Sequence, residues 1–171
     1  MYKTALVCGV WDKLHEGHKN IIKYSIENSE LLKIFVLEIN IHDRHEEPFI
    51  PYEERKKTVE NYVLSLGARD KVQIIGKKDA TEVMVLDELR TVDCAFACAK
   101  DKNQQILEMI KITQDRVAKL EGPDGRKPFV MEWVDPVKND EGKIISSSKY
   151  RKKSRLEKEK RVNSSGGYGR F

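Results

Sequence analysis

Five short apolar runs, separated by segments with a helical pattern, limit the fold of this chain more than any other feature. The runs cover residues 4–8, 34–41, 72–75, 94–99 and 129–134. Each run is almost continuously apolar, which is typical of strands that are buried on both faces of a sheet. Strands that alternate with helices pair in parallel, because each helix carries the chain back across one face of the sheet. The alternation therefore predicts an α/β fold built on one five-stranded parallel sheet.

Four segments between the runs repeat apolar residues every three to four positions, as amphipathic helices do. They cover residues 16–28, 51–66, 79–89 and 103–120, and Gly67 is the expected C-cap of the second segment. The side chains expected to face the sheet are Ile21, Ile22, Ser25 and Ile26, then Val59, Tyr62, Val63 and Leu66, then Val83, Leu86 and Leu89, and finally Ile106, Leu107, Ile110, Val117 and Leu120. With helices on both faces, the predicted sheet is doubly wound and Rossmann-like.

The chain is long enough for one domain with one sizeable core, since it has 171 residues of which 39% are hydrophobic. We expect this domain to cover residues 1–155. Residues 156–171 are expected to form a basic helix end and a disordered tail. The net charge of +4 arises at this end, because residues 149–161 hold eight Lys or Arg against two Glu. Residues 1–148 carry a net charge of −3. The basic excess therefore does not spread over the globular body, so nucleic acid binding is not indicated.

The sequence contains no run of about 18 apolar residues and no basic stretch followed by a long apolar one at its start. We therefore expect no membrane span and no signal peptide, and a cytoplasmic protein. Cys8, Cys94 and Cys98 lie within apolar runs and lack the paired spacing of zinc ligands, so buried free thiols are expected. His42 and His45 are spaced like metal ligands, but their charged surroundings favour a solvated loop, and no protein metal site is predicted.

The turn after the first apolar run has the features of an anion site. Gly9 ends that run, and a helical pattern opens near Gly17. A strand that turns into a helix directs unpaired backbone N–H groups, and the positive end of the helix dipole, at one place. His15 and His18 would point to the same place, while Asp12 could either cap the turn or take part in the site. Because ligands of such sheets bind at the carboxyl ends of the strands, we predict that phosphates bind here.

A second segment, residues 144–151, offers another set of phosphate donors. Ser146 is a good N-cap candidate, and Ser147 and Ser148 would place further hydroxyls in the first turn of a helix. Ser147 and Arg151 are four residues apart, so they would share a helix face. The two segments together would surround a triphosphate with donors and supply almost no nucleophile. Such an inventory suits phosphoryl or nucleotidyl transfer, in which catalysis consists mostly of positioning and charge stabilisation.

Both segments resemble signatures of a known superfamily. Gly9-Val10-Trp11-Asp12 followed by His15-Glu16-Gly17-His18 resembles the G-x-F-D-x-x-H-x-G-H signature of the cytidylyltransferase-like nucleotidyltransferases. Ile145-Ser146-Ser147-Ser148-Lys149-Tyr150-Arg151 is similar to their I-S-S-T-x-x-R signature. Within that superfamily, residues 2 to about 155 resemble the archaeal and eukaryotic type of phosphopantetheine adenylyltransferase, including its P-Y-E-E-R segment at Pro51–Arg55.

The resemblance implies a reaction, namely transfer of the adenylyl group of ATP to 4′-phosphopantetheine. The products would be dephospho-coenzyme A and pyrophosphate, and the acceptor's own phosphate would attack directly. The two histidines would stabilise charge, while Arg151 and the three serines would hold the β- and γ-phosphates. Mg²⁺ would accompany ATP. The implied catalytic residues are His15, His18 and Arg151, and the implied ATP-binding residues are Gly9, Val10, Trp11, Gly17, His18, Lys100, Ser146, Ser147, Ser148 and Arg151.

Several positions leave alternatives open. Val10 replaces the usual Thr or Ser of the family signature and removes a hydroxyl, while Lys100 could contact phosphate or be a solvated surface residue. For the acceptor, Val10, Arg44 and Arg55 are the candidate binding residues. Two other functions are compatible with the residues. One is a sister nucleotidyltransferase that uses glycerol-3-phosphate with CTP or FMN with ATP, and the other is a non-catalytic nucleotide sensor.

Overall fold

The computed structural model describes residues 1–39, 50–79, 89–119, 128–145 and 160. Its five strands are β1 (Tyr2–Gly9), β2 (Ser29–Leu37), β3 (Val72–Lys77), β4 (Cys94–Cys98) and β5 (Val130–Val134). The strands form one sheet in the order β3-β2-β1-β4-β5, and every neighbouring pair is parallel. The predicted α/β fold with a five-stranded parallel sheet is therefore confirmed.

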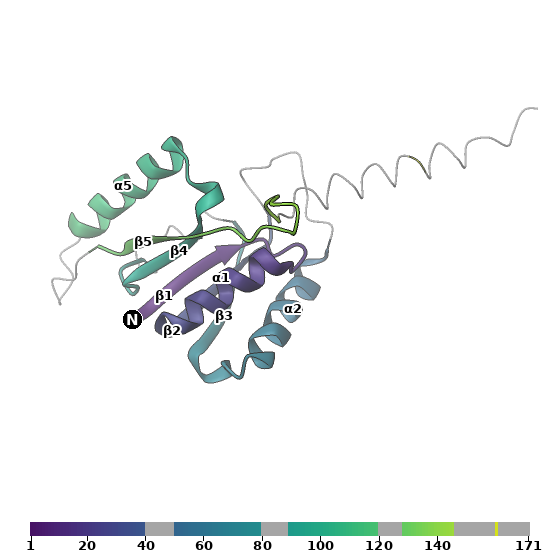
Figure 1. Cartoon of the computed structure of the whole chain (residues 1–171). Helices are drawn as coiled ribbons and strands as arrows, with labels where there is room; N and C mark the ends of the chain where they lie inside the picture. The colour runs from purple at the N-terminus through teal and green to yellow at the C-terminus, as the bar shows by residue number, and fades with distance from the viewer. Residues whose placement is uncertain (40–49, 80–88, 120–127, 146–159, 161–171) are drawn as a thin grey trace, which may run out of the picture.

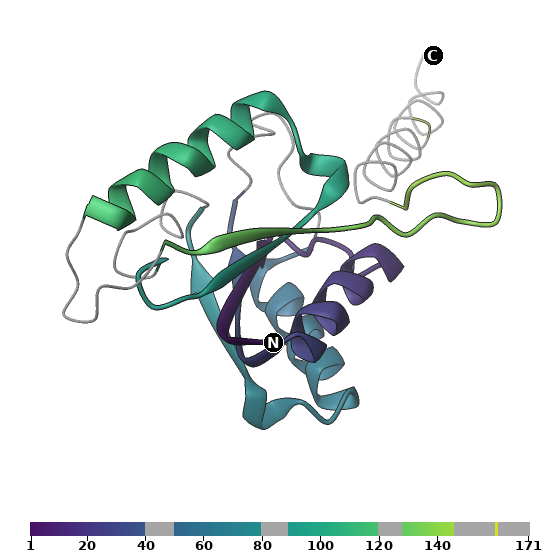
Figure 2. The same ribbon diagram turned by 60° about the vertical axis from the view of Figure 1, so that its left-hand side comes forward.

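Three helices of the described part cover the two faces of this sheet. They are α1 (Glu16–Glu27), α2 (Tyr52–Ser65) and α5 (Gln104–Lys119). Figure 1 and Figure 2 show α1 and α2 on one face and α5 on the other. A short 3-10 helix, Arg69–Lys71, leads from α2 into β3, and another, Ala99–Asp101, follows β4 directly.

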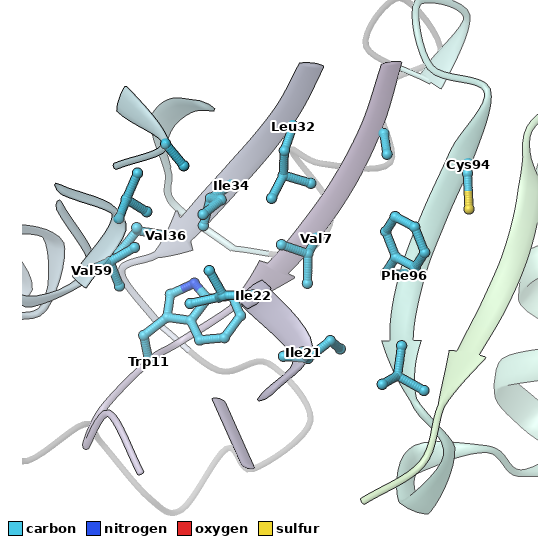
Figure 3. Packing of buried hydrophobic residues seen from close by; sticks show 14 residues of the cluster. Val7, Trp11, Ile21, Ile22, Leu32, Ile34, Val36, Val59, Cys94 and Phe96 are labelled. Carbon is cyan, nitrogen blue, oxygen red and sulfur yellow. The ribbon is translucent and has the colours of Figure 1, made fainter. Parts of the chain in front are cut away.

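Two buried clusters form the core because successive strand residues point to opposite faces. In β1, Ala5 and Val7 belong to the cluster beneath α1 and α2, whereas Leu6 belongs to the cluster beneath α5. Figure 3 shows part of the first cluster, in which Val7, Ile22 and Val59 lie close together. A strand that supplies both clusters has to be apolar at every position, and this explains the continuous apolar runs.

The observed helix boundaries agree with the predicted ones to within one residue. Two side chains that were predicted to face the sheet are exposed instead. Ile21, Ile22 and Ser25 of α1 are buried, as are Val59 and Val63 of α2 and Ile110 and Val117 of α5. Leu66 and Leu107 are each 37% exposed. Leu66 lies at the C-cap of α2, where Gly67 turns the chain with a positive φ of 66°. Leu107 lies in the first turn of α5.

Strand β2 begins five residues earlier than predicted and ends before the segment 38–41. Ser29 pairs with Tyr2 of β1, so the chain enters β2 directly from the end of α1. The buried Ser29 hydroxyl donates a hydrogen bond to the Ser25 carbonyl of the preceding helix, at 2.6 Å. A serine and a glutamate can start a central strand here because a local hydrogen bond and solvent meet their polar groups.

The cysteine prediction was partly wrong, because Cys8 is exposed while Cys94 is buried and Cys98 is half-buried. All three are free thiols. Among the described residues, no helix is long and apolar enough to cross a membrane. The predictions for residues 80–88, 156–159 and 161–171 lie outside the described residues.

Candidate functional site

The carboxyl ends of β1 and β4 flank the start of α1, and most of the predicted site residues of the described part gather there. β1 ends at Gly9, the chain turns through residues 10–15, and α1 begins at Glu16. β4 ends at Cys98, and Lys100 lies in the short 3-10 helix Ala99–Asp101 that follows. The order of the sheet reverses between β1 and β4, so this is the place where open parallel sheets bind ligands.

His15 is the N-cap residue of α1 and is buried, with 8% of its surface exposed. Its Nδ1 atom accepts hydrogen bonds from the backbone N–H groups of Gly17, at 3.1 Å, and His18, at 3.3 Å. Because Nδ1 accepts, the proton of the neutral ring must reside on Nε2. Burial, followed by the charge of Lys100, lowers the pKa of His15 to about 4. His15 is therefore a neutral imidazole at neutral pH with an Nε2–H donor.

The lowered pKa of His15 predicts a specific dependence of stability on pH. The unfolded chain takes up a proton at His15 below about pH 6.5, whereas the folded chain does so only near pH 4. The free energy of unfolding should therefore fall as the pH drops from 6.5 to 4. Replacing His15 with asparagine keeps an N-cap acceptor and removes the titration, so it should flatten this part of the profile. Urea unfolding across that range measures both curves, and equal slopes for the two proteins would refute the assignment.

His18 lies in the first turn of α1 and has the opposite tautomer. Its Nδ1 atom lies 2.9 Å from the carbonyl oxygen of Lys13, which can only accept, so Nδ1 carries the proton. The two imidazoles are stacked, with centroids 3.8 Å apart and an interplanar angle of 19°. His18 consequently presents an Nε2 lone pair when neutral and an Nε2–H donor when protonated. The pair thus combines a permanent neutral donor with a donor that depends on protonation.

Gly17 is required by the close approach of two groups to the start of α1. A Cβ atom at this position would lie 3.0 Å from the His15 ring and 3.3 Å from the carbonyl oxygen of Ile145. Ile145 directly precedes the serines of the second motif, and its N–H donates to the Val137 carbonyl, at 3.0 Å. Figure 1 shows this segment passing the carboxyl end of β1. The described chain therefore brings the beginning of the second motif against the first motif.

Arg55 is a buried cation that holds the turn after β1 in place. It is 2% exposed, and its guanidinium donates to the backbone carbonyls of Val10, Leu37, Glu38 and Ile50. The Ile50 N–H in turn donates to the Asp12 carboxylate, at 3.0 Å. Burial lowers the pKa of Arg55, and the Asp12 charge opposes this shift. Four backbone contacts occupy the guanidinium, so the described geometry assigns Arg55 to fastening the loop and not to gripping an acceptor.

This role of Arg55 was missed in the sequence, although a signal exists. Arg55, Val59 and Val63 follow one another at four-residue spacing, which places Arg55 on the buried stripe of α2. Asp12 is also buried, at 4% exposure, and it accepts a hydrogen bond from the Ile50 N–H. Of the two roles predicted for Asp12, this contact favours the structural one. His18 and Arg55 donate to backbone carbonyls, and the positions of backbone carbonyls leave no pattern in the sequence. These hydrogen bonds could therefore not be predicted.

The other predicted residues differ in how the structure places them. Val10 is half-buried against the core beneath α5, and the side chain of Trp11 is 3% exposed, so only the Trp11 backbone can meet a ligand. The Lys100 ammonium is close enough to His15 to affect its pKa, and it pairs with Asp101 at 3.4 Å. Predictions for Arg44, for the serines 146–148 and for Arg151 lie outside the described residues. Within the described ranges, no three His, Cys, Asp or Glu residues cluster as metal ligands.

Comparison with known proteins places this geometry in a family. A family model described as cytidylyltransferase-like matches residues 6–153, which is most of the chain. The chain belongs to the cytidylyltransferase-like family. The match confirms the predicted resemblance and the nucleotidyltransferase type of the chain.

Individual proteins similar to this cytidylyltransferase-like chain include a curated relative and two solved structures. A phosphopantetheine adenylyltransferase from Methanopyrus kandleri is 24% identical over 151 residues, which cover 88% of this chain and 89% of that protein. A lipopolysaccharide core biosynthesis protein from Thermoplasma volcanium has a TM-score of 0.54 and 17% identity over 82% of this chain and 100% of its own. A bifunctional NMN adenylyltransferase/ADP ribose pyrophosphatase from Francisella tularensis has a TM-score of 0.59 and 19% identity over 90% of this chain and 42% of its own. The two structures share the fold.

Proposed function

We propose that this protein transfers the adenylyl group of ATP to 4′-phosphopantetheine, giving dephospho-coenzyme A and pyrophosphate. The observation that carries the proposal is the histidine pair at the start of α1, at the carboxyl end of β1, with Nδ1 of each ring committed to the backbone. This leaves the Nε2 atoms of both rings available beside a helix N-terminus. The 24% identity to a phosphopantetheine adenylyltransferase, which extends over 88% of the chain, supports the choice of acceptor.

The proposed reaction needs no general base from the protein. An oxygen of the acceptor phosphate, already anionic at neutral pH, forms a bond to the α-phosphorus of ATP. The bond between that phosphorus and the oxygen that bridges to the β-phosphorus breaks, and its electron pair leaves with pyrophosphate. Negative charge grows on the bridging and equatorial oxygens, so donors that are already oriented stabilise the transition state more than the ground state.

The described residues divide this task among them. The neutral Nε2–H of His15 donates at any pH above its lowered pKa, whereas His18 donates through Nε2 only as an imidazolium. Lys100 adds positive charge beside His15, and the first N–H groups of α1 add the helix dipole. The serines 146–148 and Arg151 would hold the β- and γ-phosphates, as the second motif implies.

Mg²⁺ would accompany ATP in this reaction and neutralise part of its phosphate charge. The described site supplies N–H and ammonium donors, which suit phosphate oxygens, and the Asp12 carboxylate is already bonded to the Ile50 N–H. These residues therefore fit an ion that is held by phosphate oxygens and water. The carboxylate would not be needed as its ligand.

A pyrophosphate-release assay tests the proposed function. The protein is incubated with Mg²⁺ and either ATP or CTP, and with 4′-phosphopantetheine, glycerol-3-phosphate or FMN, and the products are identified by mass. We expect release only with ATP and 4′-phosphopantetheine. Pantetheine without its phosphate is the matched control, because it lacks the attacking oxygen. Folded protein with no turnover on this pair would refute the proposal, and turnover with CTP or FMN would assign a sister reaction.

A further inference from the structure

Trp11 has a backbone conformation that an aromatic residue adopts only when its surroundings hold it there. Its φ of 53° lies in the left-handed region, and it is the one non-glycine residue of the described chain with a positive φ. A bulky residue in this region is strained, because its Cβ atom crowds the following carbonyl oxygen. The turn directs the Trp11 side chain back beneath the end of β1, into the core cluster that Figure 3 shows.

The indole of Trp11 is fixed at this position by its polar atom and by a glycine. Its Nε1–H donates to the carbonyl oxygen of Phe35 in β2, at 2.9 Å, in a buried hydrogen bond. Gly9 makes room for the ring, since a Cβ atom there would lie 3.0 Å from Trp11 Cε2. In Figure 3 the ring lies among Ile22, Val36 and Val59. The position of the indole is therefore set by β1, β2 and α2 together.

The fixed indole contacts the imidazole of His18. The two ring centroids are 5.1 Å apart, with an interplanar angle of 74°, which is a favourable edge-to-face arrangement. His18 is thereby held by the Trp11 ring, by the stacked His15 ring and by the Lys13 carbonyl. We propose that Trp11 is a positioning residue, whose indole, anchored on the Phe35 carbonyl, fixes the orientation of the His18 imidazole for its role at the transferred phosphate.

This inference rests on the proposed function for its catalytic part only, because the ring geometry can be measured without turnover. The anchor is a property of tryptophan, since phenylalanine would keep an aromatic ring but could not donate to the Phe35 carbonyl. The substitution Trp11→Phe therefore separates the anchor from mere burial of a ring. Trp133 of β5 packs in the other core cluster, beneath α5, so Trp133→Phe is the matched control for the loss of an indole.

Steady-state kinetics with ATP and 4′-phosphopantetheine give the first test. We expect Trp11→Phe to lower kcat about tenfold and to change the KM for ATP less than about twofold, because a misplaced charge-stabilising group acts mainly on the transition state. In a background of His18→Ala, the same substitution should have almost no further effect on kcat. A structural defect, or a contact with substrate that is independent of His18, would instead lower kcat by the same factor in both backgrounds.

Two-bond ¹H–¹⁵N correlation spectra of the histidine rings give the second test. The wild-type protein and Trp133→Phe should show the Nδ1–H tautomer of neutral His18, whereas Trp11→Phe should show a mixture of tautomers. Urea unfolding confirms that each variant is folded under these conditions. An unchanged His18 tautomer in Trp11→Phe, or additive effects in the kinetic cycle, would overturn the inference. Absence of turnover in the wild-type protein would refute the proposed function alone, and the spectra would still decide whether Trp11 orients His18.

Discussion

Replacing His18 with alanine is expected to lower kcat by a factor of about 10² to 10³ while the protein remains folded. Three groups hold the His18 ring, namely the Lys13 carbonyl at 2.9 Å, the stacked His15 ring and the Trp11 indole, so the ring is oriented before substrate binds. Loss of a donor that is oriented in advance removes stabilisation from the transition state chiefly, and the KM for ATP should change much less. Steady-state pyrophosphate release measures both constants.

An exposed lysine of the same helix provides the control for this experiment. Lys23 of α1 is exposed and pairs with Glu27, at 3.8 Å, away from the start of the helix. Lys23→Ala should leave kcat within about twofold, because an exposed ion pair contributes little. If His18→Ala kept a near-normal kcat in protein shown to be folded, His18 would have no part in the chemistry.

Replacing Arg55 with alanine is expected to lower the free energy of unfolding by about 3–5 kcal/mol. The change would leave the buried Asp12 carboxylate without the nearby positive charge and would remove the donor to four backbone carbonyls. These carbonyls belong to the ends of β1 and β2 and to the segment before α2, so the loss would loosen the turn that carries Val10. Urea unfolding followed by circular dichroism measures the change.

Lys57 of the same helix is the matched control, since it is exposed. Lys57→Ala should change the free energy of unfolding by no more than about 0.5 kcal/mol. Arg55→Lys should recover only part of the loss, because an ammonium on a flexible stem cannot reproduce the planar fork of donors. A loss below about 1 kcal/mol in Arg55→Ala would contradict the fastening role.

The fold was predictable because burial on both faces of a sheet leaves a simple trace in the sequence. Continuous apolar runs at 72–75 and 94–99 correspond to β3 and β4, which differ from them by at most two residues at the end. The start of β2 was missed because Ser29, Glu30 and Lys33 interrupt the apolar pattern there. Their strand conformation comes from pairing with β1, which is a tertiary effect that local periodicity cannot reveal.

The candidate site was predictable in its side chains but not in its proton positions. The spacing of His15 and His18 around Gly17 indicated a site, and the structure brings both rings together. Which nitrogen of each ring carries the proton depends on the Lys13 carbonyl and on the N–H groups of α1, whose positions follow from the turn and not from residue type. Arg55 was a candidate for binding the acceptor because arginine suits phosphates. It lies on the buried face of α2, however, and its guanidinium donates to backbone carbonyls.

The central place of β1 in the sheet has a consequence for co-translational folding. One edge of β1 pairs with β2, only some 27 residues later in the chain, as Tyr2 opposite Ser29 shows. The other edge pairs with β4, so Ala5 has to wait for Cys94. Until that residue emerges, the nascent chain carries an apolar strand with an open edge, which is the feature that invites association with other chains. Slow translation before Cys94 should therefore increase the demand for chaperones, although the histidine pair and its supports lie entirely in the segment made first.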